Sequence, residues 1–170
     1  MSHAQVAIVM GSDSDWPKIC KAKEALDEFD VGCEVHVMSA HRTPDRVAQF
    51  AREAAGRGIR IIIAAAGGAA HLAGVVAAHT SLPVIGLPVP TAELGGLDSL
   101  LSTVQMPGDV PVATMAVGMG GPRNAGLFAV QILALSDPVL AEAFQSFKQK
   151  LEEKIIAKDD RLKEQLHGSA

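Results

Sequence analysis

Short apolar runs alternate with segments of helical periodicity along most of this chain, and this alternation constrains the fold more than any other feature. The strand-type runs are Val6–Met10, Cys33–Met38, Ile59–Ala66, Leu82–Leu87 and Val112–Val117. The third run is almost uninterruptedly apolar, which is typical of a parallel strand buried on both faces. Strands that alternate with helices in this way predict a doubly wound α/β fold, with a five-stranded parallel sheet and helices on both of its faces.

The predicted helices lie between these runs, and their apolar residues recur at helical spacing. We expect the first helix to begin near Pro17, and its apolar stripe comprises Ile19, Ala22, Leu26 and Phe29. The second is expected to begin with Thr43 as N-cap and Pro44 in the first turn, and its buried stripe comprises Val47, Phe50, Ala51 and Ala54. Further helices are expected over about 70–79, 97–104 and 123–135.

A long last helix is predicted over about 138–162, and its apolar stripe comprises Leu140, Phe144, Phe147, Leu151 and Ile155. At about 1.5 Å per residue this helix would extend beyond a compact domain, so we expect it to pack on a neighbouring subunit. No internal repeat or linker interrupts the sequence. Residues 1–170 are therefore predicted to form a single catalytic domain, with a core over about 6–135, this helix and a short tail after it.

Composition and charge exclude several classes of partner. The 170 residues are 48% hydrophobic and carry a formal net charge of -4, so the chain can build a core but offers no basic footprint for nucleic acid or an anionic membrane. Cys20 and Cys33 have no CxxC spacing, which argues against a disulfide or a zinc site. With strand-type sequence from Val6 onward and no apolar run of about 20 residues, we expect a soluble cytoplasmic protein without a leader.

Four loops are expected at the carboxyl ends of the strands, where open α/β sheets bind ligands. They comprise residues 11–15, 39–42, 67–71 and 118–124. The second loop places His41, whose imidazole can exchange a proton near neutral pH, beside Arg42, whose planar fork of donors holds an anion. In the third loop, Gly67 and Gly68 would let backbone N–H groups approach a ligand closely.

Each loop also has a purely structural interpretation. The serines and aspartates of the first loop are typical N-caps. A Gly-Gly pair after a strand commonly serves only the turn, and His71 is more often a hydrogen-bonded structural histidine than a catalyst. The second loop taken alone is as consistent with an ordinary polar turn as with catalysis, and it is the combination of loops that favours a ligand site.

Arg42 and Arg123 are the basic residues of these four loops. One arginine together with hydroxyl and backbone donors suffices to bind a phosphomonoester, and an ionised Asp15 can accept hydrogen bonds from ribose hydroxyls. No Walker motif and no G-x-G-x-x-G motif follows a strand, which disfavours ATP and dinucleotides. No cluster of carboxylates and histidines has metal-ligand spacing, so no metal is predicted.

Five motifs carry a resemblance to a known family. They are Val6–Trp16, Ser39–Pro44, Gly67–Leu72, Asp98–Ser102 and Val104–Pro107. In this order and spacing, over about 6–135, the chain resembles the 5-(carboxyamino)imidazole ribonucleotide mutases of bacterial purine biosynthesis. The resemblance implies a flavodoxin-like three-layer fold and a homo-octamer with active sites at subunit junctions.

The resemblance also implies a reaction. An isomerase would convert the carboxyamino ribonucleotide of imidazole into the amino ribonucleotide carboxylated on the ring, in IMP biosynthesis, without a cofactor or a metal. The implied course is decarboxylation, recarboxylation at the ring carbon and removal of the ring proton by His41. Ser12, Asp15 and Arg42 are implied to bind the ribonucleotide, with Arg42 near the phosphate, and Ser39 to line the pocket. Substrate contacts are further expected from Gly68, Ala69, His71 and Leu72.

Two other functions stay open. A direct aminoimidazole ribonucleotide carboxylase uses carbon dioxide, but that class usually has lysine after the histidine and lacks the Gly-Gly-Ala-Ala-His run. A non-catalytic receiver-like module would fit Asp13 and Asp15, but the third strand ends in alanine and glycine instead of a phosphorylatable aspartate. The chain departs from the family pattern at Ala73, where proline is usual, and at Met119, where lysine is common and Arg123 is a candidate to compensate.

Overall fold

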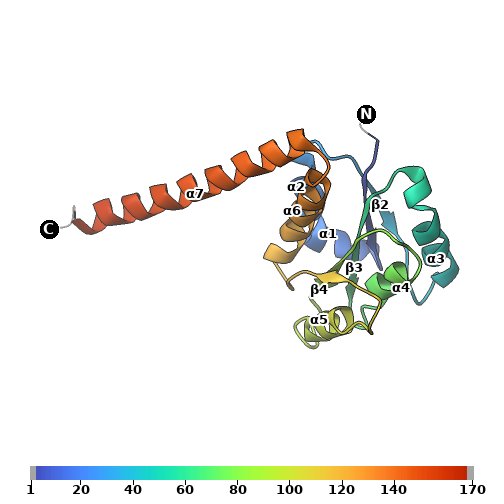
Figure 1. Cartoon of the computed structure of the whole chain (residues 1–170). Helices are drawn as coiled ribbons and strands as arrows, with labels where there is room; N and C mark the ends of the chain where they lie inside the picture. Colours follow the sequence, from blue (N-terminus) through green and yellow to red (C-terminus); the bar gives the residue numbers. More distant parts are fainter. Residues whose placement is uncertain (1–2, 168–170) are drawn as a thin grey trace. The chain divides into compact units, whose positions relative to one another are not determined.

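The computed structural model describes residues 3–167, which divide into two compact units, one up to Val130 and one from Gln131. The first unit holds the sheet (Figure 1). Among the described residues its strands are β1 (Val6–Met10), β2 (Cys33–Val37), β3 (Ile61–Gly67), β4 (Val84–Val89) and β5 (Ala113–Thr114). They form one 5-stranded sheet in the order β2-β1-β3-β4-β5, and every pairing is parallel. The predicted doubly wound, flavodoxin-like α/β class is confirmed.

Strand boundaries differ from the sequence prediction at the edge of the sheet. β5 has only two residues, Ala113 and Thr114, which pair with Ile85 and Gly86 of β4. The N–H of Met115 also donates to the carbonyl of Gly86, at 2.9 Å. β3 and β4 each begin two residues later than predicted, and their carboxyl ends lie further along the chain than predicted, where Gly67 pairs with Val89. Because β1 and β3 are parallel neighbours, the loops that follow them lie at the same edge of the sheet.

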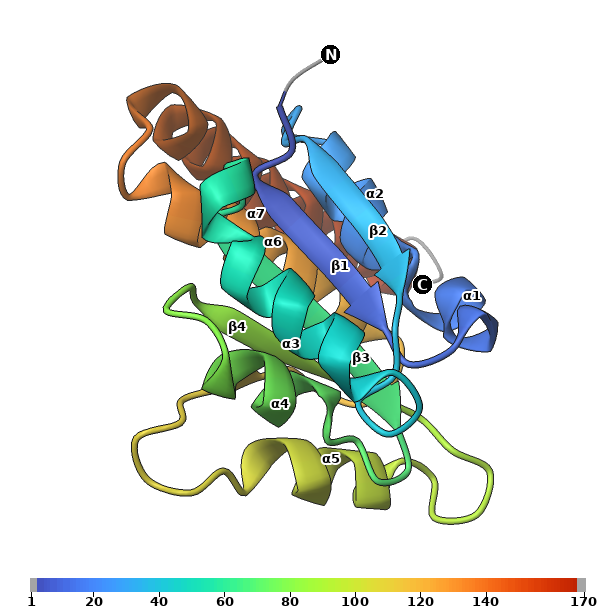
Figure 2. The ribbon, with the colours of Figure 1, turned by 90° about the vertical axis from the view of Figure 1, so that its right-hand side faces the viewer.

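The helices cover both faces of the sheet (Figure 2). They are α1 (Trp16–Ile19), α2 (Lys21–Asp27), α3 (Pro44–Glu53), α4 (Leu72–Ala78), α5 (Leu97–Val104) and α6 (Gly120–Ala134), with short 3-10 turns at Asp13–Asp15 and Ala55–Arg57. On one face, the core of α3, α4 and the strands comprises Val47, Phe50, Ala51, Ala54, Leu72, Ala73, Val76, Ala7, Val9, Ile62, Ala64 and Val84. The predicted stripe of α3 is thereby confirmed.

Small residues let the helices of the other face approach closely. Strand residues alternate between faces, so Val6 and Ile8 point to the side opposite Ala7 and are also fully buried. There, Gly126 of α6 lies so near α2 that an added Cβ would stand 2.8 Å from the Cβ of Ala25. A chain with few aromatic residues thus fills this side of its core by bringing the backbones of its helices close together.

The second unit contains the long helix α7 (Pro138–His167). Asp137 caps it, because its Oδ1 accepts the N–H groups of Val139 and Leu140, each at 3.1 Å, and Pro138 takes the first turn. The helix continues beyond the predicted end at Leu162, so part of the predicted tail is helical, and residues 168–170 lie outside the described chain. Within residues 3–167, none of the helices combines the length and apolarity that a membrane span requires.

Candidate active site

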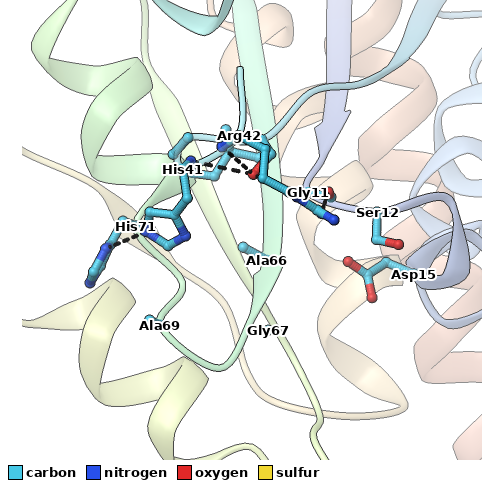
Figure 3. Close-up of a pocket in the computed structure, with 12 residues that line it drawn as sticks. Gly11, Ser12, Asp15, His41, Arg42, Ala66, Gly67, Ala69 and His71 are labelled. Carbon is cyan, nitrogen blue, oxygen red and sulfur yellow. Dashed lines mark hydrogen bonds between the residues drawn. The ribbon is translucent and has the colours of Figure 1, made fainter. Parts of the chain in front are cut away.

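An open cleft of about 410 Å³ lies at the carboxyl ends of β1, β2 and β3 (Figure 3). The sheet order changes direction between β1 and β3, and the crevice at such a switch point is where doubly wound folds bind ligands. Its lining residues are Gly11, Ser12, Asp15, Ser39, Ala40, His41, Arg42, Ala66, Gly67, Ala69, His71 and Leu72. Of the predicted site residues, Gly68 alone is outside this lining, although it sits in the same loop.

The first loop supplies a hydroxyl and a carboxylate. Ser12 is an N-cap, as its structural interpretation predicted, because its Oγ accepts the N–H of Ser14 at 3.3 Å. It nevertheless lines the cleft together with Asp15. Burial raises the pKa of Asp15, and the nearby charge of Lys18 and a hydrogen bond with the Ser12 backbone oppose this more weakly. Figure 3 shows Ser12 and Asp15 on one side of the cleft.

Ser39 organises the second loop. Its Oγ accepts the backbone N–H groups of His41 at 3.3 Å and Arg42 at 3.2 Å. Thr43 in turn accepts the N–H of Ser39 at 2.9 Å and donates to its carbonyl at 3.1 Å. Thr43 stands at the predicted N-cap of α3 and Pro44 in its first turn, but the Thr43 hydroxyl closes the loop on the N-terminal side and makes no capping hydrogen bond. These contacts fix the backbone that carries His41 and Arg42.

Arg42 spans the cleft between the first and second loops. Its Nη2 donates to the carbonyl of Gly11 at 2.8 Å and its Nε to Ser39 Oγ at 3.4 Å. Among the described residues no further protein group binds the guanidinium, so Nη1 can serve an anion in the cleft. The side chain is held in place before any ligand arrives.

His41 and His71 both line the cleft, and their rings are in contact. Nε2 of His41 lies 2.7 Å from Nδ1 of His71, and the rings are perpendicular, with their centroids 4.8 Å apart. One ring must donate and the other accept, so the tautomers of the two histidines are coupled. When Nε2 of a neutral His41 donates to His71, the basic lone pair of His41 is on Nδ1. His71 is thus a hydrogen-bonded histidine, and its partner is a residue of the same site.

Two backbone amides of the third loop, those of Gly68 and Ala70, bind side chains of the protein. The N–H of Gly68 donates to Ser99 Oγ at 2.9 Å, and that of Ala70 donates to Ser102 Oγ at 3.0 Å. Gly68 is needed for the turn itself, because its φ is +67°. The sequence reasoning missed these two serines, although both stand in the Asp98–Ser102 motif that carried the family resemblance.

The fourth loop does not join the cleft, which corrects the expectation that four loops converge. Gly118 and Met119 instead line a separate, more apolar cavity of about 300 Å³. Arg123 lies inside α6, and its guanidinium pairs with both carboxylate oxygens of Glu28 at 2.7 and 2.9 Å. It therefore gives no charge to the cleft in place of Met119. Ala73 is buried in the first turn of α4, where its methyl group packs near Gly86.

The charge pattern suits a small anion. Arg42 is the cation of the lining, and Asp15 is its carboxylate. Among residues 3–167, no three histidines, cysteines or carboxylates are grouped in a way that could hold a metal ion. The arrangement offers one anchored anion binder, an acceptor for hydroxyl groups and a coupled pair of imidazoles.

Known proteins match this chain over most of its length. The sequence model of the family described as AIR carboxylase matches residues 5–154. N5-carboxyaminoimidazole ribonucleotide mutase of Mycobacterium tuberculosis (strain CDC 1551 / Oshkosh) is 55% identical over 158 residues, which cover 93% of this chain and 90% of that protein.

Two further similarities place the match in context. Phosphoribosylaminoimidazole carboxylase of Schizosaccharomyces pombe is 54% identical over 157 residues, which cover 92% of this chain but 28% of that protein. The crystal structure of Treponema denticola PurE is similar in fold, with a TM-score of 0.85 at 29% identity, covering 93% of this chain and 98% of that one.

Proposed function

Because the chain belongs to the AIR carboxylase family, we propose that it is an N5-carboxyaminoimidazole ribonucleotide mutase, an isomerase of purine biosynthesis. The observation that carries this proposal is the cleft that holds His41 in contact with His71 and Arg42 anchored on Gly11. A proton-transfer group beside a fixed anion binder is what a phosphoribosyl-imidazole isomerisation requires.

The substrate binds across the first and second loops. Arg42, with Ser12 and Ser39, binds the phosphate, since a guanidinium and hydroxyl donors complement its oxygens. Asp15 accepts hydrogen bonds from the ribose hydroxyls and does so in its ionised form. Because burial raises the pKa of Asp15, acidification weakens this contact at a higher pH than for an ordinary aspartate. The imidazole ring then lies toward Ala69, His71 and Leu72.

The reaction moves one carboxyl group without net change of atoms. The N–C bond of the carbamate breaks and a proton is delivered to the exocyclic nitrogen, which releases carbon dioxide and the amine form of the ring. The electron-rich ring carbon then attacks the retained carbon dioxide. His41 removes the proton from that carbon, and the ring recovers its aromaticity. One proton is delivered to the exocyclic nitrogen and one is removed from the ring carbon, so a single imidazole can serve both steps.

The test follows the origin of the carboxyl carbon. Purified protein is given the carbamate substrate labelled with ¹³C in its carboxyl group, in one assay without bicarbonate and in a second with unlabelled bicarbonate. We expect turnover without added bicarbonate, with most label retained in the product because the cleft holds the carbon dioxide. Product formation that depends strictly on added bicarbonate would contradict the mutase.

A direct carboxylase is the second candidate, favoured by the 54% identity to the Schizosaccharomyces pombe carboxylase. The same assay with the amine ribonucleotide and bicarbonate separates the two enzymes. Appreciable turnover there, and none with the carbamate, would establish the carboxylase instead.

The proposal extends to assembly and location. A homo-octamer in the cytoplasm is proposed, with α7 packed on a neighbouring subunit. In support, Leu151 and Ile155 on the apolar stripe of α7 are 41% and 61% exposed. Apolar side chains at regular spacing on an exposed helix face are typical of a helix that packs against a protein partner.

A further inference from the structure

A buried hydroxyl of α5 holds the loop after β3. Ser99 Oγ accepts the N–H of Gly68 at 2.9 Å and donates to the carbonyl of Val89 at 2.7 Å. The side chain is fully buried, so no solvent competes for these bonds. One hydroxyl therefore ties the carboxyl end of β3 to that of β4, and its donor and acceptor are both used inside the protein.

A second hydroxyl, one turn along α5, holds the same loop on its other side. Ser102 Oγ accepts the N–H of Ala70 at 3.0 Å. Its single proton lies within reach of the carbonyl of Gly68 at 3.1 Å and of Asp98 at 2.7 Å. The two serines thus hold the backbone at residues 68 and 70 by hydrogen bonds, and Ala69, which lies between these residues, lines the cleft.

The segment held by these bonds, residues 68–70, leads directly to His71. The N–H of His71 donates to the carbonyl of Ala69 at 2.8 Å, which makes a tight turn. The ring of His71 then contacts His41 at 2.7 Å, and Figure 3 shows the two rings and Ala69 on the same side of the cleft. Because residues 68–70 directly precede His71, a displacement of this segment would move Nδ1 of His71 and change its hydrogen bond with His41.

We propose that Ser99 and Ser102 are positioning residues of the isomerase reaction, which set the place of the His71 ring and through it the tautomer and orientation of His41. This inference rests on the proposed function for its kinetic part only. Neither serine touches the cleft. Their effect on turnover passes through the backbone of the third loop.

The decisive variant is Ser102→Ala. A hydroxyl that is half-buried can be removed with less damage than fully buried Ser99. We expect kcat to fall about 10- to 100-fold, as displacements of catalytic groups by about 1 Å commonly do. KM should change much less, because Arg42 and Asp15 belong to the other two loops. The pH profile of kcat should shift as well, and Ser102→Thr, which keeps the hydroxyl, should restore wild-type values.

Thr103→Val is the matched control in the same helix. Thr103 is buried like Ser99, but its hydroxyl donates to the carbonyl of Ser99 within α5 at 2.7 Å and makes no contact with the third loop. We expect its kcat, KM and pH profile to match the wild type. An equal loss of kcat in Ser102→Ala and Thr103→Val would mean that the serines only stabilise α5, and this result would overturn the proposal.

A measurement without substrate separates this inference from the proposed function. Long-range ¹H–¹⁵N spectra of the imidazole rings report the tautomer and hydrogen bonding of His41 and His71 in the free protein. We expect Ser102→Ala to change both sets of ring signals and Thr103→Val to leave them in place. Unchanged ring signals in folded Ser102→Ala would overturn the positioning role, whereas a wild-type protein without mutase turnover would contradict the proposed function alone.

Discussion

His41 and Arg42 are neighbours in sequence but have different partners, which separates proton transfer from binding at the scale of single residues. His41 turns to His71 on the third loop, and Arg42 turns to Gly11 on the first. Ser39 holds the backbone of both through two hydrogen bonds. Substitution of His41 should therefore lower turnover, whereas substitution of Arg42 should lower the affinity for the ribonucleotide.

For His41→Asn, we expect turnover of the carbamate substrate to fall about 10²- to 10⁴-fold, because a positioned acid/base group contributes that much to rate. Ribonucleotide affinity should stay within a few-fold, since Arg42 and Asp15 are unchanged. Steady-state kinetics and calorimetry measure the two quantities. His79→Asn is the control, because His79 contacts Arg52 away from the cleft. Near-normal turnover in His41→Asn would remove His41 from proton transfer.

For Arg42→Ala, we expect the affinity for the phosphorylated ligand to fall about 10- to 150-fold, since a hydrogen bond to a charged group contributes about 1.5–3 kcal/mol. Calorimetry with the amine ribonucleotide measures this. Arg46→Ala removes the same charge in the first turn of α3, outside the cleft lining, and this variant should bind the ligand normally. Equal affinities of the two variants would contradict the phosphate anchor.

At the scale of elements, the helices are held by close contacts and by few strong polar pairs. α6 approaches α2 at Gly126 and carries the pairing of Arg123 with Glu28. The first contact is a packing constraint, and the second is an ion pair between side chains that are 37% and 46% exposed. Their contributions to stability should differ in size and in response to pH.

Gly126→Ala should destabilise the protein by about 1–3 kcal/mol, the usual range for overpacking. The added methyl group would overlap the carbonyl oxygen of Ala22, and backbone cannot move aside as a flexible side chain can. Gly120→Ala in the same helix is the control, because an added Cβ there meets nothing within 4 Å. Urea denaturation of the two variants checks the prediction, and equal midpoints would contradict it.

Arg123→Gln should lower stability at neutral pH by only about 0.2–1 kcal/mol, the range for exposed ion pairs. The hydrogen bonds from Arg123 lower the pKa of Glu28 below its ordinary value. The pair therefore stabilises the folded state above the unfolded pKa of Glu28, and this contribution is lost as the pH falls through the folded pKa. Denaturation at neutral and strongly acidic pH should show a difference between wild type and variant only at neutral pH.

At the scale of the whole molecule, the cleft is open and the last helix carries apolar side chains on its surface. His41, Arg42 and His71 are all exposed. Retention of carbon dioxide requires exclusion of water, so we propose that a neighbouring subunit of the octamer closes the site. Assembly and turnover should then fail together.

Leu151→Glu should reduce the size of the assembly, because a charge on the apolar stripe of α7 opposes its burial against a partner. Sedimentation velocity measures the mass, and circular dichroism checks that helix content is kept. Gln149→Glu introduces the same charge on the opposite side of α7 and should assemble normally. An unchanged mass for Leu151→Glu would exclude this stripe from the interface.

Local sequence signals were sufficient for the class of fold and for most of the cleft. The alternation of strand-type runs and helical stripes predicted the parallel sheet, since burial on one or two faces imposes a period that is visible along the chain. Parallel strands end at a common edge, so the loops carrying Ser12, Asp15, Ser39, His41 and Arg42 could be brought together on topology alone.

The tertiary structure decided which partners these residues have. The contact of His41 with His71 and the grip of Ser99 and Ser102 on the third loop join residues that are 30 to 32 positions apart. Arg123 was a candidate for the site by its place in sequence, yet Glu28, 95 residues away, binds it instead. Periodicity records only whether a side chain is buried, whereas hydrogen-bond partners depend on distances between distant segments, and those exist only once the sheet has formed.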